Sequence, residues 1–292
     1  MPVHDDLGTR MKTYYEQISK TKLMRRMPVI IRIDGKAFHT FTKGFKRPFD
    51  EILIKSMQET TKYLCENIQG CVLGYTQSDE ITLVLVDYQR FETAAWFDYE
   101  VQKMCSIAAS MATMAFNKLF LDNVDAAYQE EFYKRGLNQG GTLSEIDKLN
   151  EEYRVYYDKV NKAMFDARVF NIPKEEVTNC VYWRQLDCSR NSIQMVGQAY
   201  FSHKELQNKS CSNIQDMLME QKGINWNDFP TYQKRGTCVI KEEYLPYEPA
   251  PGCEDCDINA ADYRTRWIID KNIPIFKGDG REYIDKLIMV GE

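Results

Sequence analysis

The strongest constraint on the fold is a pair of apolar runs that flank a short polar segment. Residues 71–75 and 81–86 are rich in aliphatic and aromatic side chains, and Thr76-Gln77-Ser78-Asp79-Glu80 lies between them. Two such runs joined by a few polar residues predict a β-hairpin. Its tip would then carry two carboxylates, those of Asp79 and Glu80.

The rest of the chain alternates between helical and extended patterns. Apolar residues spaced three and four apart indicate helices, and β-branched runs bounded by turn residues indicate strands. The order strand, helix, hairpin, helix predicts an α+β fold, an antiparallel sheet with helices packed on one face. We predict helices over 5–26, 50–70, 91–119 and 143–165, and further strands over 29–33, 167–172 and 237–240.

The 143–165 helix allows two interpretations. It is either one arm of a protruding helical hairpin or a solvated helix that covers part of the core.

Composition excludes several classes of protein. The chain has 292 residues, a net charge of −5 and 43% hydrophobic residues, so it is not a uniformly basic nucleic-acid binder. No window approaches the roughly 18–20 uninterrupted apolar residues of a membrane span, and the N-terminus lacks the apolar segment of a signal peptide. Nine scattered cysteines fit a reducing compartment, so we expect a cytoplasmic protein without membrane association. The pair Cys253 and Cys256 has a spacing known from zinc sites, but no second pair follows it, and an acidic loop is the alternative.

Two carboxylates at predicted strand ends carry the chemistry. Asp34 follows the strand 29–33, and Asp79 lies at the hairpin tip. If these strands are neighbours, the two like charges converge, and a divalent cation would stabilise them. Mg²⁺ accepts one or two carboxylates together with phosphate oxygens, and a pair of such ions serves phosphoryl transfer. The alternative is that Asp34-Gly35 is only a turn and 78–80 only a polar loop.

Basic residues after Asp34 would supply charge for a polyphosphate. These are Lys36, His39, Lys43, Lys46 and Arg47. A solvated basic loop is the alternative interpretation.

Several motifs in order resemble the tRNA(His) guanylyltransferase family. They are Arg32-Ile-Asp-Gly-Lys-Ala-Phe-His39-Thr-Phe41, Arg47-Pro-Phe-Asp50, Gly74-Tyr-Thr-Gln-Ser-Asp-Glu80, Phe165-Asp-Ala-Arg168, Trp183-Arg-Gln-Leu-Asp-Cys188, and Gly223-Ile-Asn-Trp-Asn227 with Lys234-Arg-Gly236. The resemblance covers roughly residues 1–245. It implies a polymerase-like palm with a helical insertion at about 120–165, followed by a C-terminal extension, 246–292.

The resemblance also implies an activity. Family members add nucleotides to tRNA 5′ ends in the 3′→5′ direction, with two Mg²⁺ ions and with GTP and ATP as substrates. By matching position, the catalytic residues would be Asp34, Asp79 and Glu80, and the metal ligands Asp34, Gly35 and Asp79. The nucleotide-binding residues would be Lys36, Ala37, Phe38, His39, Arg47, Asp50, Ser78 and Lys103. Around Lys103 the family's basic neighbours are replaced by Asp98, Tyr99 and Glu100.

tRNA would bind to local basic and polar positions, and the resemblance implies a homotetramer whose tRNA sites span subunits. The candidate contacts are Lys20, Lys22, Arg25, Arg26, Arg184, Asp187, Asn191, Lys234 and Arg235. For the basic residues, a surface charge that contacts no phosphate is the alternative interpretation.

The sequence departs from the eukaryotic members in two places. Ser189-Arg-Asn-Ser-Ile-Gln-Met195 replaces a motif linked to tRNA(His) recognition, and Ser212-Asn-Ile-Gln-Asp216 replaces a Lys-Asn-Glu motif. Both losses resemble the bacterial and archaeal branch, in which template-dependent repair of truncated tRNA 5′ ends is favoured. Two other hypotheses stay open, a palm-type cyclase or condensing enzyme for free nucleotides and a non-catalytic tRNA-binding protein.

Overall fold

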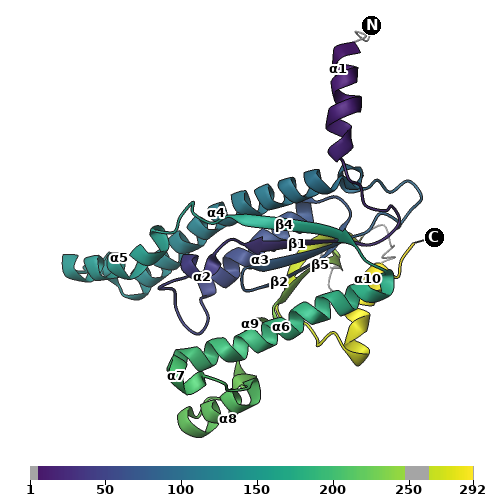
Figure 1. Cartoon of the computed structure of the whole chain (residues 1–292). Coiled ribbons are helices and arrows are strands. Elements are labelled where there is room, and N and C mark those ends of the chain that lie inside the picture. The colour runs from purple at the N-terminus through teal and green to yellow at the C-terminus, as the bar shows by residue number, and fades with distance from the viewer. Residues whose placement is uncertain (1–5, 247–262, 292) are drawn as a thin grey trace, which may run out of the picture.

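A six-stranded antiparallel sheet forms the centre of the molecule (Figure 1). The structure is a computed structural model, and it describes residues 6–246 and 263–291. The strand order is β4-β1-β3-β2-β5-β6. The strands are β1 (Val29–Gly35), β2 (Cys71–Gln77), β3 (Glu80–Leu85), β4 (Phe165–Asn171), β5 (Thr237–Tyr244) and β6 (Arg264–Asp270). The predicted hairpin is therefore present, with a loop of two residues.

Side chains of β1 alternate between the two faces of the sheet, as the pleat requires. Ile31 and Ile33 belong to a large core under one face, and Ile30 belongs to a second core under the other. Arg32 and Asp34 share the face of Ile30. The first carboxylate of the predicted site therefore lies on the second face of the sheet.

Helices cover both faces. The first face packs against α3 (Glu51–Asn67) and α4 (Val101–Lys134), with Phe116 and Phe120 of α4 fully buried. On the second face lie α6 (Lys174–Tyr200) and α10 (Glu282–Ile288), whose Val181 and Ile284 are fully buried. The α+β class is confirmed, with the correction that helices pack on two faces rather than one.

The long helix α4 has the length and apolar composition of a possible membrane span. By length and composition alone it could cross a membrane, with a window of mean hydropathy 1.3. Its Met104, Ala112 and Phe116 pack into the core beside the sheet, which is also how a core helix of a globular protein behaves.

The remaining helices are short or lie outside the two layers. They are α1 (Asp6–Met11), a π-helical turn (Lys12–Glu16), α2 (Phe38–Phe41), α5 (Leu143–Tyr157), α7 (His203–Leu206), α8 (Cys211–Lys222) and α9 (Thr231–Arg235), with 3₁₀ turns at Gln17–Ser19, Trp96–Tyr99, Leu137–Gln139, Trp226–Asp228 and Gly278–Arg281.

Four predicted helix boundaries were wrong. The helix predicted to end at residue 119 continues as α4 to Lys134, so the first part of the insertion predicted at about 120–165 is a continuation of this helix. The N-terminal helical segment ends at Ser19 rather than Arg26. The helix predicted over 91–119 begins only at Val101, because the 3₁₀ turn before it contains positive φ angles at Phe97 and Asp98 that no α-helix accommodates. The helix predicted over 143–165 ends at Tyr157, and strand β4 already begins at Phe165.

Helix α5 lies beside the last part of α4, beyond the sheet (Figure 1). A capping box of Thr142 and Glu145 begins it, and Leu149, Tyr153 and Tyr156 are buried against the rest of the fold. Both interpretations of this segment are therefore partly confirmed, because α5 protrudes beyond the sheet and also covers part of the core.

Residues 174–200 and 264–270 form two elements that were not predicted from the sequence. The structure shows the helix α6 and the strand β6 there, and β6 extends the sheet next to β5. Residues 263–291 therefore complete the sheet and one of its helical layers.

Candidate active site

Three strand ends bring acidic side chains to one edge of the sheet. In the antiparallel register Asp34 of β1 lies opposite Glu80 of β3 and also opposite Asp166 of β4. Asp79 occupies the two-residue loop before Glu80, and the Gly35 N–H donates a 3.1 Å hydrogen bond to the Asp79 carbonyl oxygen. The end of β1 and the hairpin tip are thus directly joined. The predicted convergence of Asp34 and Asp79 is present in the structure.

The local backbone is held in unusual conformations. Ser78 has a φ of +51°, in the left-handed region that side chains other than glycine rarely adopt. Its hydroxyl donates a 3.0 Å hydrogen bond to Asp79 Oδ1, which fixes the carboxylate. Gly35 permits a close approach, because a Cβ there would lie 2.3 Å from the ring of Phe38. A larger residue than glycine would displace the chain beside Asp34.

The ionised form of Asp79 is energetically unfavourable in this position. Burial raises the pKa of Asp79 above its ordinary value, and the negative charges of Asp34 and Glu80 raise it further, against the opposing hydrogen bond from Ser78. A half-buried carboxylate beside like charges does not stabilise a fold by itself. This arrangement is typical of a functional site.

Glu80 differs from the two aspartates because arginines neutralise it. Arg32 Nη2 lies 3.0 Å from Glu80 Oε1, and Arg184 Nε lies 2.7 Å from the same oxygen. The Arg184 contact is a close ion pair without the alignment of a hydrogen bond. Asp187 holds the other end of that guanidinium at 2.6 Å. Glu80 therefore supports the edge within a buried ion-pair network.

Asp166 and Arg168 also lie at this site, although their sequence surroundings do not predict it. The guanidinium of Arg168 lies 3.3 Å from Asp166 Oδ1 and 4.0 Å from Asp34 Oδ2. The motif Phe165-Asp-Ala-Arg168 is part of the family resemblance, but only the pairing of β4 with β1 brings it beside Asp34. These residues add a third carboxylate and one exposed cation to the edge.

The donor set can be tested for a fit to Mg²⁺. Within residues 6–246 and 263–291, no group of three or more His, Cys, Asp or Glu side chains forms a cage for a metal ion. Mg²⁺ needs no such cage, since it takes one or two carboxylates and completes its shell with water and substrate phosphates. Asp34 and Asp79 therefore fit an ion that binds together with a nucleotide.

The residues predicted to bind the nucleotide follow directly after Asp34. Ala37 has a φ of +54° and begins the short helix α2, which presents His39 to solvent. Lys36 is also exposed, and its backbone N–H donates to the Met164 carbonyl. Phe38 is buried in an aromatic cluster, so its side chain is part of the core.

Arg47 and Asp50 have different surroundings although they are close in sequence. Arg47 is exposed, whereas Asp50 is buried at the N-terminus of α3. The Asp50 carboxylate accepts hydrogen bonds from the backbone N–H of Leu53 and of Lys46, and from the Tyr156 hydroxyl at 2.6 Å. In this structure Asp50 acts as a helix cap.

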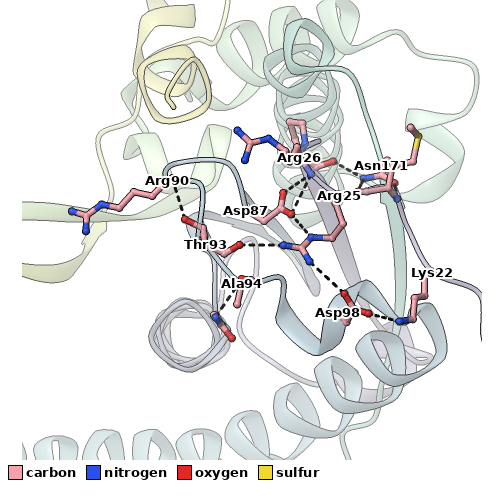
Figure 2. Close-up of polar contacts among 12 residues, drawn as sticks. Lys22, Arg25, Arg26, Asp87, Arg90, Thr93, Ala94, Asp98 and Asn171 are labelled. Carbon is pink, nitrogen blue, oxygen red and sulfur yellow. Dashed lines mark hydrogen bonds and ion pairs between the residues drawn. The ribbon is translucent and has the colours of Figure 1, made fainter. Parts of the chain in front are cut away.

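Four of the predicted residues lie at the opposite end of the sheet from Asp34: Lys22, Arg25, Arg26 and Lys103. Figure 2 shows Arg25 between the carboxylates of Asp87 and Asp98, with Lys22 on the other oxygen of Asp98. Asp87 follows β3, whose last residue pairs with the first residue of β1, so β1 separates this cluster from the acidic edge by about 20 Å. The fourth residue, Lys103, lies in the first turn of α4, which begins beside this cluster, with its ammonium over the Phe97 ring.

The other predicted tRNA contacts are partly internal. Lys234 is buried, with its ammonium donating to the Asn227 carbonyl and lying over the Trp226 ring. Asn191 reaches Asp187 at 3.5 Å, and Lys20 pairs with Glu16 on the surface. Arg26 and Arg235 have no side-chain hydrogen bond or ion pair among the described residues. Cys253 and Cys256 lie outside those residues.

Comparison with known proteins agrees with this geometry. The family model described as tRNA(His) guanylyltransferase matches residues 8–173. A solved structure titled as a bacterial tRNA(His) guanylyltransferase-like protein in complex with ATP is 40% identical, with a TM-score of 0.74, and the match covers 97% of this chain and 98% of that one. A related structure of a complex with GTP is 37% identical, with a TM-score of 0.70, and the match covers 98% and 100% of the two chains.

A curated relative, the tRNA(His) guanylyltransferase of Debaryomyces hansenii, is 25% identical over 73% of each chain. The higher likeness to the bacterial structures supports the predicted bacterial-type branch. The chain therefore belongs to the tRNA(His) guanylyltransferase family and is a nucleotidyltransferase of the bacterial type.

Proposed function

We propose that the protein adds nucleotides to tRNA 5′ ends in the 3′→5′ direction, with Mg²⁺, as a template-dependent repair enzyme. The observation that carries this proposal is the convergence of Asp34 and Asp79 on one edge, where burial and like charge make their proximity costly. The ATP and GTP complexes of the bacterial-type relatives support nucleoside triphosphates as substrates.

Each group at the edge would have a separate task. Asp34, Asp79 and the Gly35 carbonyl would hold the metal ions, which neutralise charge on the transferred phosphoryl group when they are bound. Lys36 and the Ser78 hydroxyl would bind the triphosphate, and Glu80 would keep the hairpin tip in place through its arginines. The 3′-hydroxyl of the incoming nucleotide would attack the activated 5′ phosphorus of the tRNA and form a new P–O bond. The bond between that phosphorus and the bridging oxygen of the activating group would break, and the activating group would leave with this oxygen.

The position of Lys103 supports an oligomer. In its own chain it lies at the end of the sheet opposite to Asp34, so it would reach a 5′ end at the acidic edge only from another subunit. A homotetramer with tRNA sites that span subunits fits this separation. A cytoplasmic location stays a prediction from composition.

The experiment that tests the function offers three substrates to the purified protein with Mg²⁺. They are a tRNA lacking its first nucleotide, an intact tRNA(His), and nucleoside triphosphates without tRNA. Filling of the truncated end with the nucleotide complementary to the opposite base supports templated repair. Addition of G to tRNA(His) alone would contradict the repair role, and turnover without tRNA would favour a cyclase or condensing activity.

A further inference from the structure

A polar hollow lies outside the acidic edge. It has a volume of about 430 Å³ and lies between the loop that carries Arg47 and the segment from the end of α6 to the start of α8. The polar side chains that line it are two permanent cations, one histidine and three amides: Arg47, Lys209, His203, Gln194, Gln198 and Gln207. A space of this size accommodates a mononucleotide unit.

The floor of the hollow is part of a buried apolar cluster. Phe201 and Ile214 line it and belong to a small buried cluster that joins α6, α8 and the 3₁₀ turn at Trp226. Gly197 allows α6 and α8 to approach, since a Cβ there would lie 2.8 Å from Ile214 Cγ2. Gln194 and Gln198 are one helical turn apart on α6, so both amides point from the same face.

The charge of the hollow favours an anion. Among residues 6–246 and 263–291, no carboxylate lines it, although the whole chain carries a net charge of −5. The nearest acid in sequence, Glu205, accepts hydrogen bonds from the backbone and hydroxyl of Ser202 and caps α7. Within the described residues, the six polar side chains of the lining make no hydrogen bond or ion pair with the protein, so their donors are available to a ligand.

We propose that this hollow binds one phosphate-bearing nucleotide. Arg47, Lys209 and His203 would contact the phosphate, because guanidinium, ammonium and imidazole N–H groups all donate to phosphate oxygens. The glutamine amides would bind the base, since each offers a donor and an acceptor to a base edge. The site rests on the proposed function, which makes both free triphosphates and the nucleotides of tRNA available to it.

Equilibrium binding tests the proposal without a catalytic readout. Dissociation constants would be measured for ATP and GTP without tRNA, and for a tRNA lacking its first nucleotide without triphosphates. The test variants are Lys209→Glu and Gln198→Ala, both at exposed positions. The matched control is Lys204→Glu, which makes the same charge change on the neighbouring helix α7 and does not line the hollow.

Lys209→Glu is expected to weaken one ligand about tenfold relative to Lys204→Glu, and Gln198→Ala to weaken the same ligand. Loss of ATP or GTP affinity would identify a free nucleotide as the occupant. Loss of tRNA affinity, with a shallower dependence of binding on salt concentration, would identify a nucleotide of the RNA. Affinities equal to those of the control for all three ligands would overturn the proposal. These binding measurements test whether the hollow binds a nucleotide even if the protein does not add nucleotides to tRNA. The proposal for the hollow and the proposed function can therefore fail separately.

Discussion

The ion-pair network around Glu80 predicts a large loss of stability when Arg184 is removed. Arg184 is only 6% exposed and contacts the carboxylates of both Glu80 and Asp187. Removing one partner of a buried ion pair costs about 3–5 kcal/mol, because the remaining charge stays buried. Here Glu80 keeps Arg32, so we expect Arg184→Ala to lower the free energy of unfolding by about 3 kcal/mol. At about 2–4 °C for each kcal/mol, the melting temperature would fall by about 6–12 °C.

Urea unfolding followed by circular dichroism measures this loss. The matched control is Arg190→Ala, since Arg190 also pairs with Asp187 but its side chain is 61% exposed. An exposed pair contributes about 1 kcal/mol or less, so the control should change little. A loss below about 1 kcal/mol for Arg184→Ala would refute the reasoning that Glu80 depends on this guanidinium.

Three further predictions concern structural residues. Asp50→Ala should lower the free energy of unfolding by about 3 kcal/mol in a thermal melt, since the substitution removes a helix cap and the partner of the Tyr156 hydroxyl. Asp50→Asn should retain most of the wild-type stability, and equal losses for the two variants would contradict the role of Asp50 as a cap. Gly197→Val should cost about 1–3 kcal/mol in urea unfolding by forcing α8 away at Ile214, and an unchanged midpoint would contradict the close approach. Burial alone would raise the pKa of Asp187, but two arginines hold it below its ordinary value, so this carboxylate stabilises the fold above about pH 4 and less as the pH falls further. Urea midpoints at pH 7 and pH 3 should therefore differ less for Asp187→Asn than for the wild type, and an equal difference would contradict this.

The acidic edge could be predicted because its evidence is local. Asp34 and Asp79 each adjoin a run of strand-forming residues. The hairpin of β2 and β3 is predicted from neighbouring residues alone, and it places Asp79 in the loop at its tip. Asp166 and Arg168 could not be found in this way, since nothing near them in sequence indicates that β4 pairs with β1. Their contribution depends on contacts that are more than 130 residues apart.

Missing partners explain the other errors. Lys22 and Arg25 look like free cations in the sequence, and only the fold brings Asp87 and Asp98 to them (Figure 2). Strand β6 has exposed and half-buried residues without a clear alternation, so its strand character comes from pairing with β5. Helix α6 buries polar side chains such as Arg184 and Gln185 and exposes apolar ones such as Trp183, so its apolar residues do not mark one buried face in the sequence.

The central claim is that Asp79 is retained for chemistry at a cost to stability, and Asp79→Asn tests it most directly. Nucleotide addition to the truncated tRNA and the free energy of unfolding would be measured on the same preparation. We predict that addition falls at least about 100-fold while stability stays equal or rises, because the substitution removes a half-buried charge beside Asp34 and Glu80. Addition at the wild-type rate, or a loss of addition that accompanies a loss of stability, would contradict the account.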